Sequence, residues 1–161
     1  ISRSAAAVLL TLCAFILAAC SEPGQRSSIP GSGPPASAEQ ITSFFSGKSY
    51  PTDFNGETYY AANGTVKSFQ YFKSGPKVCT GTWRASGSSV LGTSRCYWVG
   101  DDGKIKSGGN KKQNFQVRLA GGYMDLMNEK GEFIGSVRKG YPVQGFPREA
   151  EFNKLSKQLG L

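Results

Sequence analysis

The stretch that decides the fold is residues 57–72, ETYYAANGTVKSFQYF, in which two runs rich in Tyr, Phe, Val and Thr flank Asn63-Gly64. Asn-Gly is the strongest short-range signal for a two-residue β-hairpin turn, because both residues tolerate a positive φ. The flanking runs have the aromatic and β-branched composition that is typical of strands. The stretch therefore predicts an antiparallel hairpin.

The same pattern of short strands and turns extends from about residue 55 to residue 140. Asp102-Gly103 and Lys130-Gly131 mark two further turns, and apolar residues alternate with polar ones over residues 115–119 and 133–138. Short strands at a spacing of roughly 8–12 residues are typical of antiparallel sandwiches and barrels. We expect a mainly β fold, a small antiparallel β-barrel or sandwich of about seven or eight strands.

A short helix is expected before the strands. Ser37 and Gln40 have the spacing of a capping box, in which each side chain satisfies a backbone N–H of the other. The apolar residues that follow lie one helical turn apart and share one face: Ile41, Phe44 and Phe45. We expect this helix to close one end of the sheet.

A second helix is expected after Pro147, at the end of the chain. Acidic residues lie in its first turn and lysines lie near its end, as the helix dipole favours. Its apolar residues form one narrow stripe: Phe152, Leu155 and Leu159. We expect the stripe to dock on the sheet; the alternative is a basic amphipathic helix that lies on a membrane.

The chain has 161 residues, with 19 Lys and Arg against 11 Asp and Glu, and it contains no histidine. Without histidine, it cannot form a Ser-His-Asp or Cys-His nucleophile arrangement or a zinc site that uses histidine. Two Ser-x-x-Lys pairs, at 74–77 and 136–139, fall in an expected turn and an expected strand. Penicillin-recognising enzymes instead place this spacing on a buried helix. We predict that the protein is not an enzyme, and we expect no cofactor and no metal.

Residues 5–19, AAAVLLTLCAFILAA, form an uncharged apolar run that follows a single positive charge at Arg3. A membrane-spanning helix needs about 20 residues, whereas the apolar region of a secretory signal has roughly 7–15. The run therefore predicts a signal peptide over residues 1–19. Because the chain begins with Ile1 and not with methionine, we expect the true N-terminus to lie upstream.

The end of this run, Leu17-Ala18-Ala19-Cys20, resembles the lipobox of bacterial lipoproteins. The resemblance implies cleavage before Cys20, which would carry a lipid that anchors the chain in a membrane; the alternative is a cleaved signal without a lipid. Ser21 stands where an aspartate would resemble an inner-membrane retention signal, so the analogy implies the outer membrane, facing the periplasm. We expect a flexible Pro/Gly/Ser-rich tether over residues 20–38 and a single globular domain over residues 39–161.

The chain has four cysteines. Cys13 would be removed with the signal peptide and Cys20 would carry the lipid, which leaves Cys79 and Cys96 for the folded domain. An even number of cysteines in an oxidising compartment predicts a disulfide. Cys79 shares strand parity with Trp83, and Cys96 shares it with Trp98, so we expect these four side chains on one face of the sheet. Closing a loop of about 18 residues would stabilise the fold by roughly 3 kcal/mol. The alternative, a redox-active pair, usually has the closer spacing Cys-x-x-Cys.

A basic stretch, residues 101–112 with the sequence DDGKIKSGGNKK, is followed by Arg118. If the stretch forms one long hairpin, its lysines converge at the tip and attract anionic headgroups or polymers. The alternative is a solvated loop. Nucleic acid is not an expected partner, because the chain has an export signal and no aromatic RNA-binding signature. The candidate anion-binding residues are Lys104, Lys106, Lys111, Lys112 and Arg118.

Gly81-Thr82-Trp83 followed by Cys96-Tyr97-Trp98, after a hairpin with the pattern Tyr-Tyr…Asn-Gly-Thr, resembles small uncharacterised secreted proteins of proteobacteria. In that group a Gly-x-Trp strand pairs with a strand that bears a cysteine. The resemblance covers about residues 40–100. It implies the β fold and the disulfide, and it implies no activity.

Together these features predict a non-enzymatic envelope lipoprotein, held in the membrane through Cys20. Its basic β domain would bind an anionic envelope polymer or a periplasmic partner protein. The alternative is a membrane-anchored inhibitor of a hydrolase. A protease is the better target in that case, because many lysozymes are strongly basic and would be repelled by a basic domain.

Overall fold

The computed structural model describes residues 29–52 and 55–161, so the predicted signal peptide and Cys20 lie outside the described residues. Two helices and ten strands follow one another in this order: α1 Ala38–Phe45, β1 Lys48–Thr52, β2 Gly56–Tyr60, β3 Thr65–Phe72, β4 Gly75–Ser86, β5 Ser89–Val99, β6 Ile105–Ser107, β7 Lys111–Ala120, β8 Tyr123–Met127, β9 Phe133–Arg138, β10 Val143–Gln144 and α2 Glu149–Gln158.

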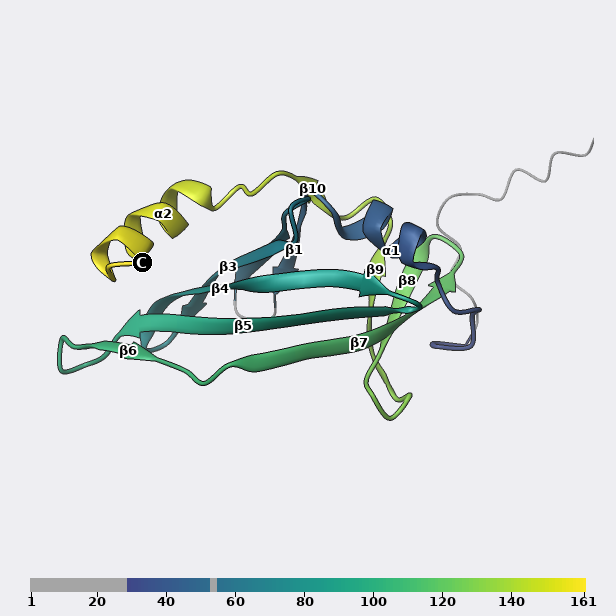
Figure 1. Cartoon of the computed structure of the whole chain (residues 1–161), viewed down its shortest axis with the longest axis horizontal. Coiled ribbons are helices and arrows are strands. Elements are labelled where there is room, and N and C mark those ends of the chain that lie inside the picture. Colours follow the sequence, from purple (N-terminus) through teal and green to yellow (C-terminus); the bar gives the residue numbers. More distant parts are fainter. Residues whose placement is uncertain (1–28, 53–54) are drawn as a thin grey trace, which may run out of the picture.

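The strands form one antiparallel sheet that curls into a half-barrel, with α1 near one end of its long axis and α2 near the other (Figure 1). The mainly β class and both helices are therefore confirmed. The sandwich alternative is wrong because the sheet is single, and the expected strand count was too low. Eight strands, β2 to β9, lie within residues 55–140, where the strands were expected, and the two that were missed, β1 and β10, lie outside that range.

The strand order is β10-β1-β2-β3-β4-β5-β7-β8-β9, so most strands pair with their neighbours in sequence. There are two exceptions: β1 pairs with β10, and β5 pairs with β7 along residues 89–94, while it pairs with β6 along residues 97–99. Within the described residues, no pairing joins the end strands β9 and β10. The sheet therefore curls without closing, and its concave side stays partly open.

The turn between β2 and β3 lies where Asn63-Gly64 predicts it, but it spans residues 61–64, and of the Asn-Gly pair only Gly64 has a positive φ, so it is not the expected two-residue turn. Gly64 has a φ of +83°, and the Ala61 N–H donates to the Thr65 carbonyl oxygen at 2.8 Å. The Asn63 side chain accepts a further hydrogen bond from the Thr65 N–H at 3.0 Å. This turn fixes the register in which Tyr60 lies opposite Val66, and both side chains are buried.

Helix α1 fills one end of the concave side. The capping box is confirmed, since the Gln40 N–H donates to Ser37 Oγ and the Ser37 N–H donates to Gln40 Oε1. Because the predicted apolar face of α1 is buried, the helix covers the sheet interior as expected. The cluster around it contains Ile41, Phe44, Phe45, Tyr50, Tyr60, Val66, Trp83, Val90, Val117 and Met124.

Two tyrosines in this cluster have raised pKa values. Burial raises the pKa of Tyr60 to about 12, and burial together with the neighbouring Tyr60 raises the pKa of Tyr50. The Tyr50 hydroxyl also donates to the Phe44 carbonyl oxygen at 2.5 Å, a bond that ionisation would abolish. Both pKa values lie above the unfolded value of about 10, so the folded state holds these protons more tightly.

We therefore expect stability to fall at alkaline pH. The stabilisation from the two protonated tyrosines is fully present below about pH 10, and it is lost as the pH rises through the folded pKa of Tyr60, about 12. Urea unfolding at a series of pH values measures this loss. The variant Tyr60→Phe should reduce the slope, whereas Tyr141→Phe, at an exposed position, should keep it. Equal slopes in the wild type and Tyr60→Phe would contradict the expectation.

Helix α2 packs on the convex side of the sheet, so its predicted docking is confirmed. Its apolar stripe belongs to a second buried cluster, which contains Phe69, Val78, Phe146, Phe152, Leu155 and Leu159. Tyr59 stacks on Phe146 with ring centroids 5.6 Å apart. Strand β3 is therefore apolar on both faces, because Val66 points into the concave cluster and Phe69 points to α2.

The segment before α1 is bound to the sheet, although it was expected to belong to the tether. The Ala36 N–H donates to the Val117 carbonyl oxygen at 2.9 Å, and the Leu119 N–H donates to the Pro34 carbonyl oxygen at 2.8 Å. The physical reason is an open edge, since the pairing of β7 with β5 ends at Gln116. The folded part of the chain therefore begins before residue 39.

Candidate functional site

A groove of about 440 Å³ occupies the end of the concave side that α1 leaves open, within the range of small-molecule sites. Its walls come from β2, β3, β4, β5 and β7 and from the segment that joins β6 to β7. The lining residues carry no carboxylate; they are Thr58, Val66, Ser68, Gln70, Phe72, Lys77, Cys79, Ser94, Cys96, Trp98, Gly108, Gly109, Lys111, Lys112 and Gln113.

The predicted disulfide forms part of the groove wall. Cys79 and Cys96 are direct cross-strand partners, with Cα atoms 3.9 Å apart, and their sulfur atoms are bonded. The same parity places Trp83 and Trp98 on the concave side, so the expectation that all four side chains share one face is confirmed. The bond joins the two longest strands across the middle of the groove.

The central cation of the groove is Lys77, two residues before Cys79 and on the same face of β4. Its Nζ lies 4.3 Å from the centroid of the Phe72 ring and 4.4 Å from that of the Trp98 ring. The ammonium is thus held between two aromatic faces, an arrangement worth about 0.5–2 kcal/mol per contact. Among the described residues, no carboxylate lies within ion-pair distance of Lys77.

Polar side chains line the groove on the side of β2 and β3. Ser68 is buried, and its hydroxyl accepts hydrogen bonds from Thr58 Oγ1 at 3.1 Å and from Gln70 Nε2 at 3.0 Å. These bonds fix the orientation of three polar groups beside the disulfide, since Ser68 lies opposite Cys79. The groove thus combines fixed hydroxyl and amide groups with lysine charge and aromatic walls.

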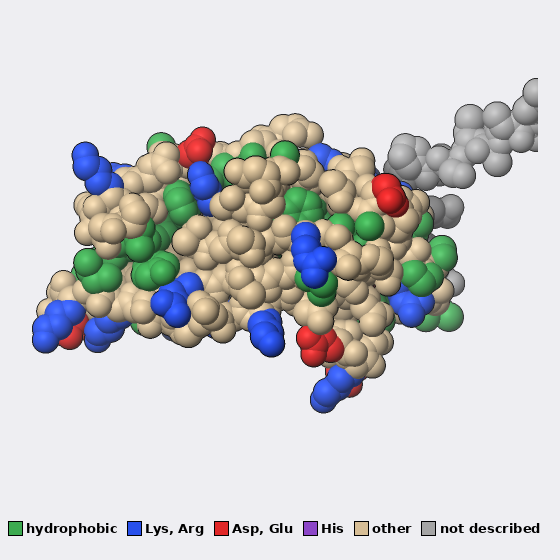
Figure 2. Space-filling model, viewed as in Figure 1, with side chains coloured by type: hydrophobic (Ala, Val, Ile, Leu, Met, Phe, Trp, Pro, Cys, Tyr) green, Lys and Arg blue, Asp and Glu red, His purple; other side chains and the backbone are tan. Residues whose placement is uncertain are grey.

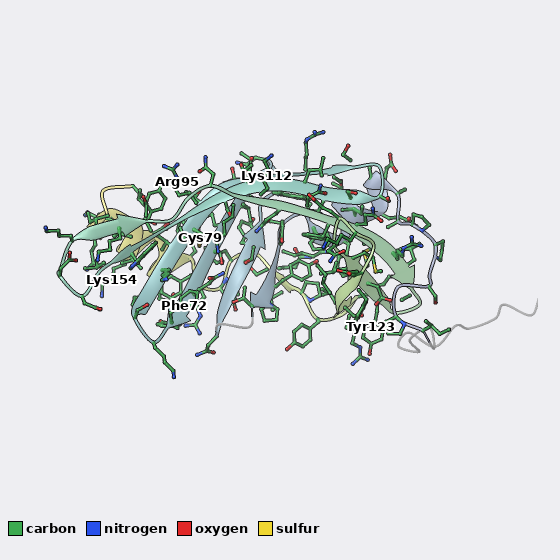
Figure 3. The ribbon with its side chains drawn as sticks, turned by 90° about the horizontal axis from the view of Figure 1, so that it is seen from below. Phe72, Cys79, Arg95, Lys112, Tyr123 and Lys154 are labelled. Atoms are coloured by element: carbon green, nitrogen blue, oxygen red, sulfur yellow. A yellow bond between two sulfur atoms is a disulfide. The ribbon has the colours of Figure 1, made fainter. Side chains whose placement is uncertain are left out.

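The structure does not bring the five predicted anion-binding residues together. Both Lys111 and Lys112 border the groove, but successive side chains of a strand point to opposite faces, so the Lys111 side chain faces the groove while that of Lys112 lies on the convex side with Arg95 (Figure 3). Arg118 lies six residues further along β7, about 20 Å from Lys112, and its side chain donates to the Gly33 carbonyl oxygen. The stretch 101–112 is therefore not one hairpin, because β5 pairs separately with β6 and β7.

The tip between β5 and β6 is nearly balanced in charge. Its residues 101–106 carry two aspartates and two lysines, Lys104 and Lys106. The Lys106 ammonium lies 3.5 Å from a carboxylate oxygen of Asp102. In Figure 2 the acidic side chain at this end lies beside the basic ones. The predicted turn at Asp102-Gly103 is present, but the tip alone has little net charge to attract an anion.

Lys77, Phe72 and Trp98 were not predicted as a site. A signal was nevertheless available, because the parity that groups Cys79 with Trp83 also includes Lys77. The contact with Phe72 comes from the pairing of β3 with β4, in which Phe72 lies opposite Gly75. A hairpin with this register brings the two residues close together, and the sequence alone does not fix the register.

Neither a membrane-spanning helix nor a metal site is found in the described part of the chain. No helix within residues 29–52 and 55–161 is long and apolar enough to cross a membrane. No group of three or more cysteine or carboxylate side chains in the same ranges has the spacing to hold a metal ion. The Ser136 hydroxyl of one Ser-x-x-Lys pair donates to the buried carboxylate of Asp125.

Comparison with known proteins adds no assignment: no family model matches the chain, and no curated protein or solved structure is significantly similar to it. The resemblances to lipoproteins and to small secreted proteins therefore stay predictions. The groove is the feature of the described fold that has the properties of a ligand site.

Proposed function

We propose that this protein is a lipid-anchored binding protein of the bacterial envelope, and that its groove holds an anionic group of an envelope component. The observation that carries the proposal is the position of Lys77 between Phe72 and Trp98 in a groove whose lining has no carboxylate. The proposal is a binding function without catalysis.

The arrangement suits an anion for two physical reasons. The rings hold the Lys77 ammonium at a defined place, so little side-chain entropy is lost when a ligand binds. Lys111 adds a second positive charge on the same side of the sheet. A cation with no acidic partner among the described residues attracts anions more strongly in a partly dehydrated groove than at an exposed surface.

The proposed location rests on the sequence. A lipid on Cys20 would hold the domain at the outer membrane, facing the periplasm, and the Pro/Gly/Ser-rich residues after it would act as the tether. The anionic groups within reach of such a domain include the carboxylates of peptidoglycan and the phosphates of lipopolysaccharide. Either group fits the same lysines, so the experiment has one arm for each.

We predict that the chain from residue 21, which contains every described residue, sediments with peptidoglycan sacculi or with lipopolysaccharide vesicles at low salt. Lys77→Gln and Lys111→Gln should each weaken binding about 10- to 100-fold, since a hydrogen bond to a charged group contributes roughly 1.5–3 kcal/mol. Lys73→Gln, which removes an exposed lysine between β3 and β4, should leave binding unchanged. Sedimentation with only one of the two materials identifies the source of the anion.

Two results would overturn the proposal. One is the absence of binding to both materials at low salt. The other is wild-type binding by a folded Lys77→Gln variant, which would mean that the two rings hold the lysine for structural reasons alone. Because the ring contacts with Phe72 and Trp98 are made by Lys77 and not by Lys111, Lys111→Gln keeps the test valid if Lys77→Gln unfolds the domain.

A further inference from the structure

The convex face of β4, β5 and β7 is polar, basic and uncovered. It lies opposite the groove, on the other side of the same three strands. Neither α2 nor the segment before α1 shields its side chains, which are all exposed: Thr80, Thr82, Arg84, Thr93, Arg95, Lys112 and Asn114. We refer to these seven residues as the convex basic face.

The register arranges three cations over this face. Lys112 lies opposite Thr93, and Arg95 lies two residues further along β5, which is about 7 Å. Arg84 lies opposite Leu91, on the other side of Thr93 along the strand direction. A shallow hollow of about 410 Å³ includes Arg84 and Lys112 in its lining. The cations thus flank a row of hydroxyl groups, at intervals that match regularly spaced groups along an extended polymer.

The charge of the face is not neutralised within the described residues. None of the three cations makes an ion pair there, and the Arg95 Nε donates to the neutral Asn110 side chain at 3.0 Å. The carboxylate in the lining of the hollow, that of Glu129, accepts a hydrogen bond from Asn114 Nδ2 at 2.8 Å. The face therefore has an excess of positive charge.

We propose that the convex basic face binds an extended acidic polysaccharide. The three cations match repeated carboxylate or sulfate groups, and the threonine hydroxyls and the Asn114 amide can donate to and accept from sugar hydroxyls. Thr82 and Thr93 lie with their hydroxyl oxygens 3.4 Å apart, which makes a pair of polar groups between the cations. Over residues 80–84, 91–95 and 112–114, no side chain on this face is aromatic, so the face lacks the platforms on which nucleic acid bases stack.

This site is separate from the groove, and its test keeps the two apart. Polygalacturonate of defined length is titrated into the chain from residue 21 at several salt concentrations. Arg95→Gln and Lys112→Gln should each weaken binding about 3- to 10-fold and reduce its salt dependence. The double variant Thr82→Val/Thr93→Val should weaken binding at all salt concentrations, since it removes hydroxyl contacts and no charge. Lys73→Gln, which removes one exposed lysine outside both sites, serves as the charge-matched control and should bind the polysaccharide like the wild type.

Titration with a single-stranded DNA of the same charge tests whether the convex basic face prefers an acidic polysaccharide to a nucleic acid. The DNA should bind at least tenfold more weakly than polygalacturonate. Equal binding of the two polyanions would overturn the proposal, because it would mean that the face attracts any polyanion by its charge alone. Failure to bind polygalacturonate at low salt, or equal binding by the wild type and a folded Arg95→Gln/Lys112→Gln variant, would also overturn it and would leave the groove proposal untouched.

Discussion

Replacement of Phe45 by alanine is expected to lower the free energy of unfolding by about 3–5 kcal/mol. The ring is 2% exposed and lies at the centre of the aromatic cluster, 4.9 Å from the Tyr50 ring, 5.1 Å from the Tyr60 ring and 6.1 Å from the Phe115 ring. Its removal leaves a cavity between α1 and the sheet. The neighbouring rings come from β1, β2 and β7, and none of these strands can shift to fill the cavity without losing hydrogen bonds to its neighbours in the sheet. The expected loss is a large part of a typical stability of about 5–15 kcal/mol.

Urea unfolding followed by circular dichroism measures this effect. Tyr141→Ala removes an aromatic ring that is 60% exposed, and it should change the free energy of unfolding by less than about 0.5 kcal/mol. If Phe45→Ala does not fold, Phe45→Leu should show a smaller loss in the same direction. A loss below about 1 kcal/mol in Phe45→Ala would mean that α1 is not anchored by this cluster.

Removal of the disulfide is expected to cost about 3 kcal/mol, chiefly because the unfolded chain gains conformational freedom when the loop between the two cysteines opens. The variant Cys79→Ala/Cys96→Ala should therefore unfold at a lower urea concentration than the oxidised wild type. The loss also bears on function, because the bond joins β4 to β5 within the groove wall.

Reduction supplies the control for this prediction. A reducing agent should destabilise the wild type by about as much as the double substitution does, and it should have no further effect on the double variant. Unchanged stability in both cases would contradict the expected contribution. A free-thiol count near zero in the oxidised chain from residue 21 would confirm that Cys79 and Cys96 are bonded in solution.

The sequence predicted those features that depend on neighbours along the chain. The Asn63-Gly64 turn and the Ser37 capping box each need only residues within four positions of one another. The disulfide was predictable because residues 79 and 96 are the cysteines left for the folded domain once the signal region is set aside. The turn and the capping box could be predicted from the chemistry of neighbouring residues, and the disulfide could be predicted because only one pair of cysteines was left to form it.

The features that depend on strand register were not predictable in the same way. Alternation along β7 separates Lys111 from Lys112, so a run that appears as one basic cluster in the sequence lies on two faces. The contact of Lys77 with both Phe72 and Trp98 needs the pairings of β4 with β3 and with β5. The binding of residues 34–36 to β7 likewise depends on where the pairing with β5 ends.

The measurement that tests the groove proposal most directly is a residue-resolved NMR titration of the chain from residue 21. The ligand is a soluble fragment of whichever material, peptidoglycan or lipopolysaccharide, the chain sediments with. We predict that the largest chemical-shift changes occur at the groove residues, with the Trp98 indole N–H and the Lys77 side chain among them, and that residues 80, 82 and 84 on the opposite face change little. Changes confined to the convex basic face, or to residues outside both sites, would contradict the assignment of the groove as the ligand site.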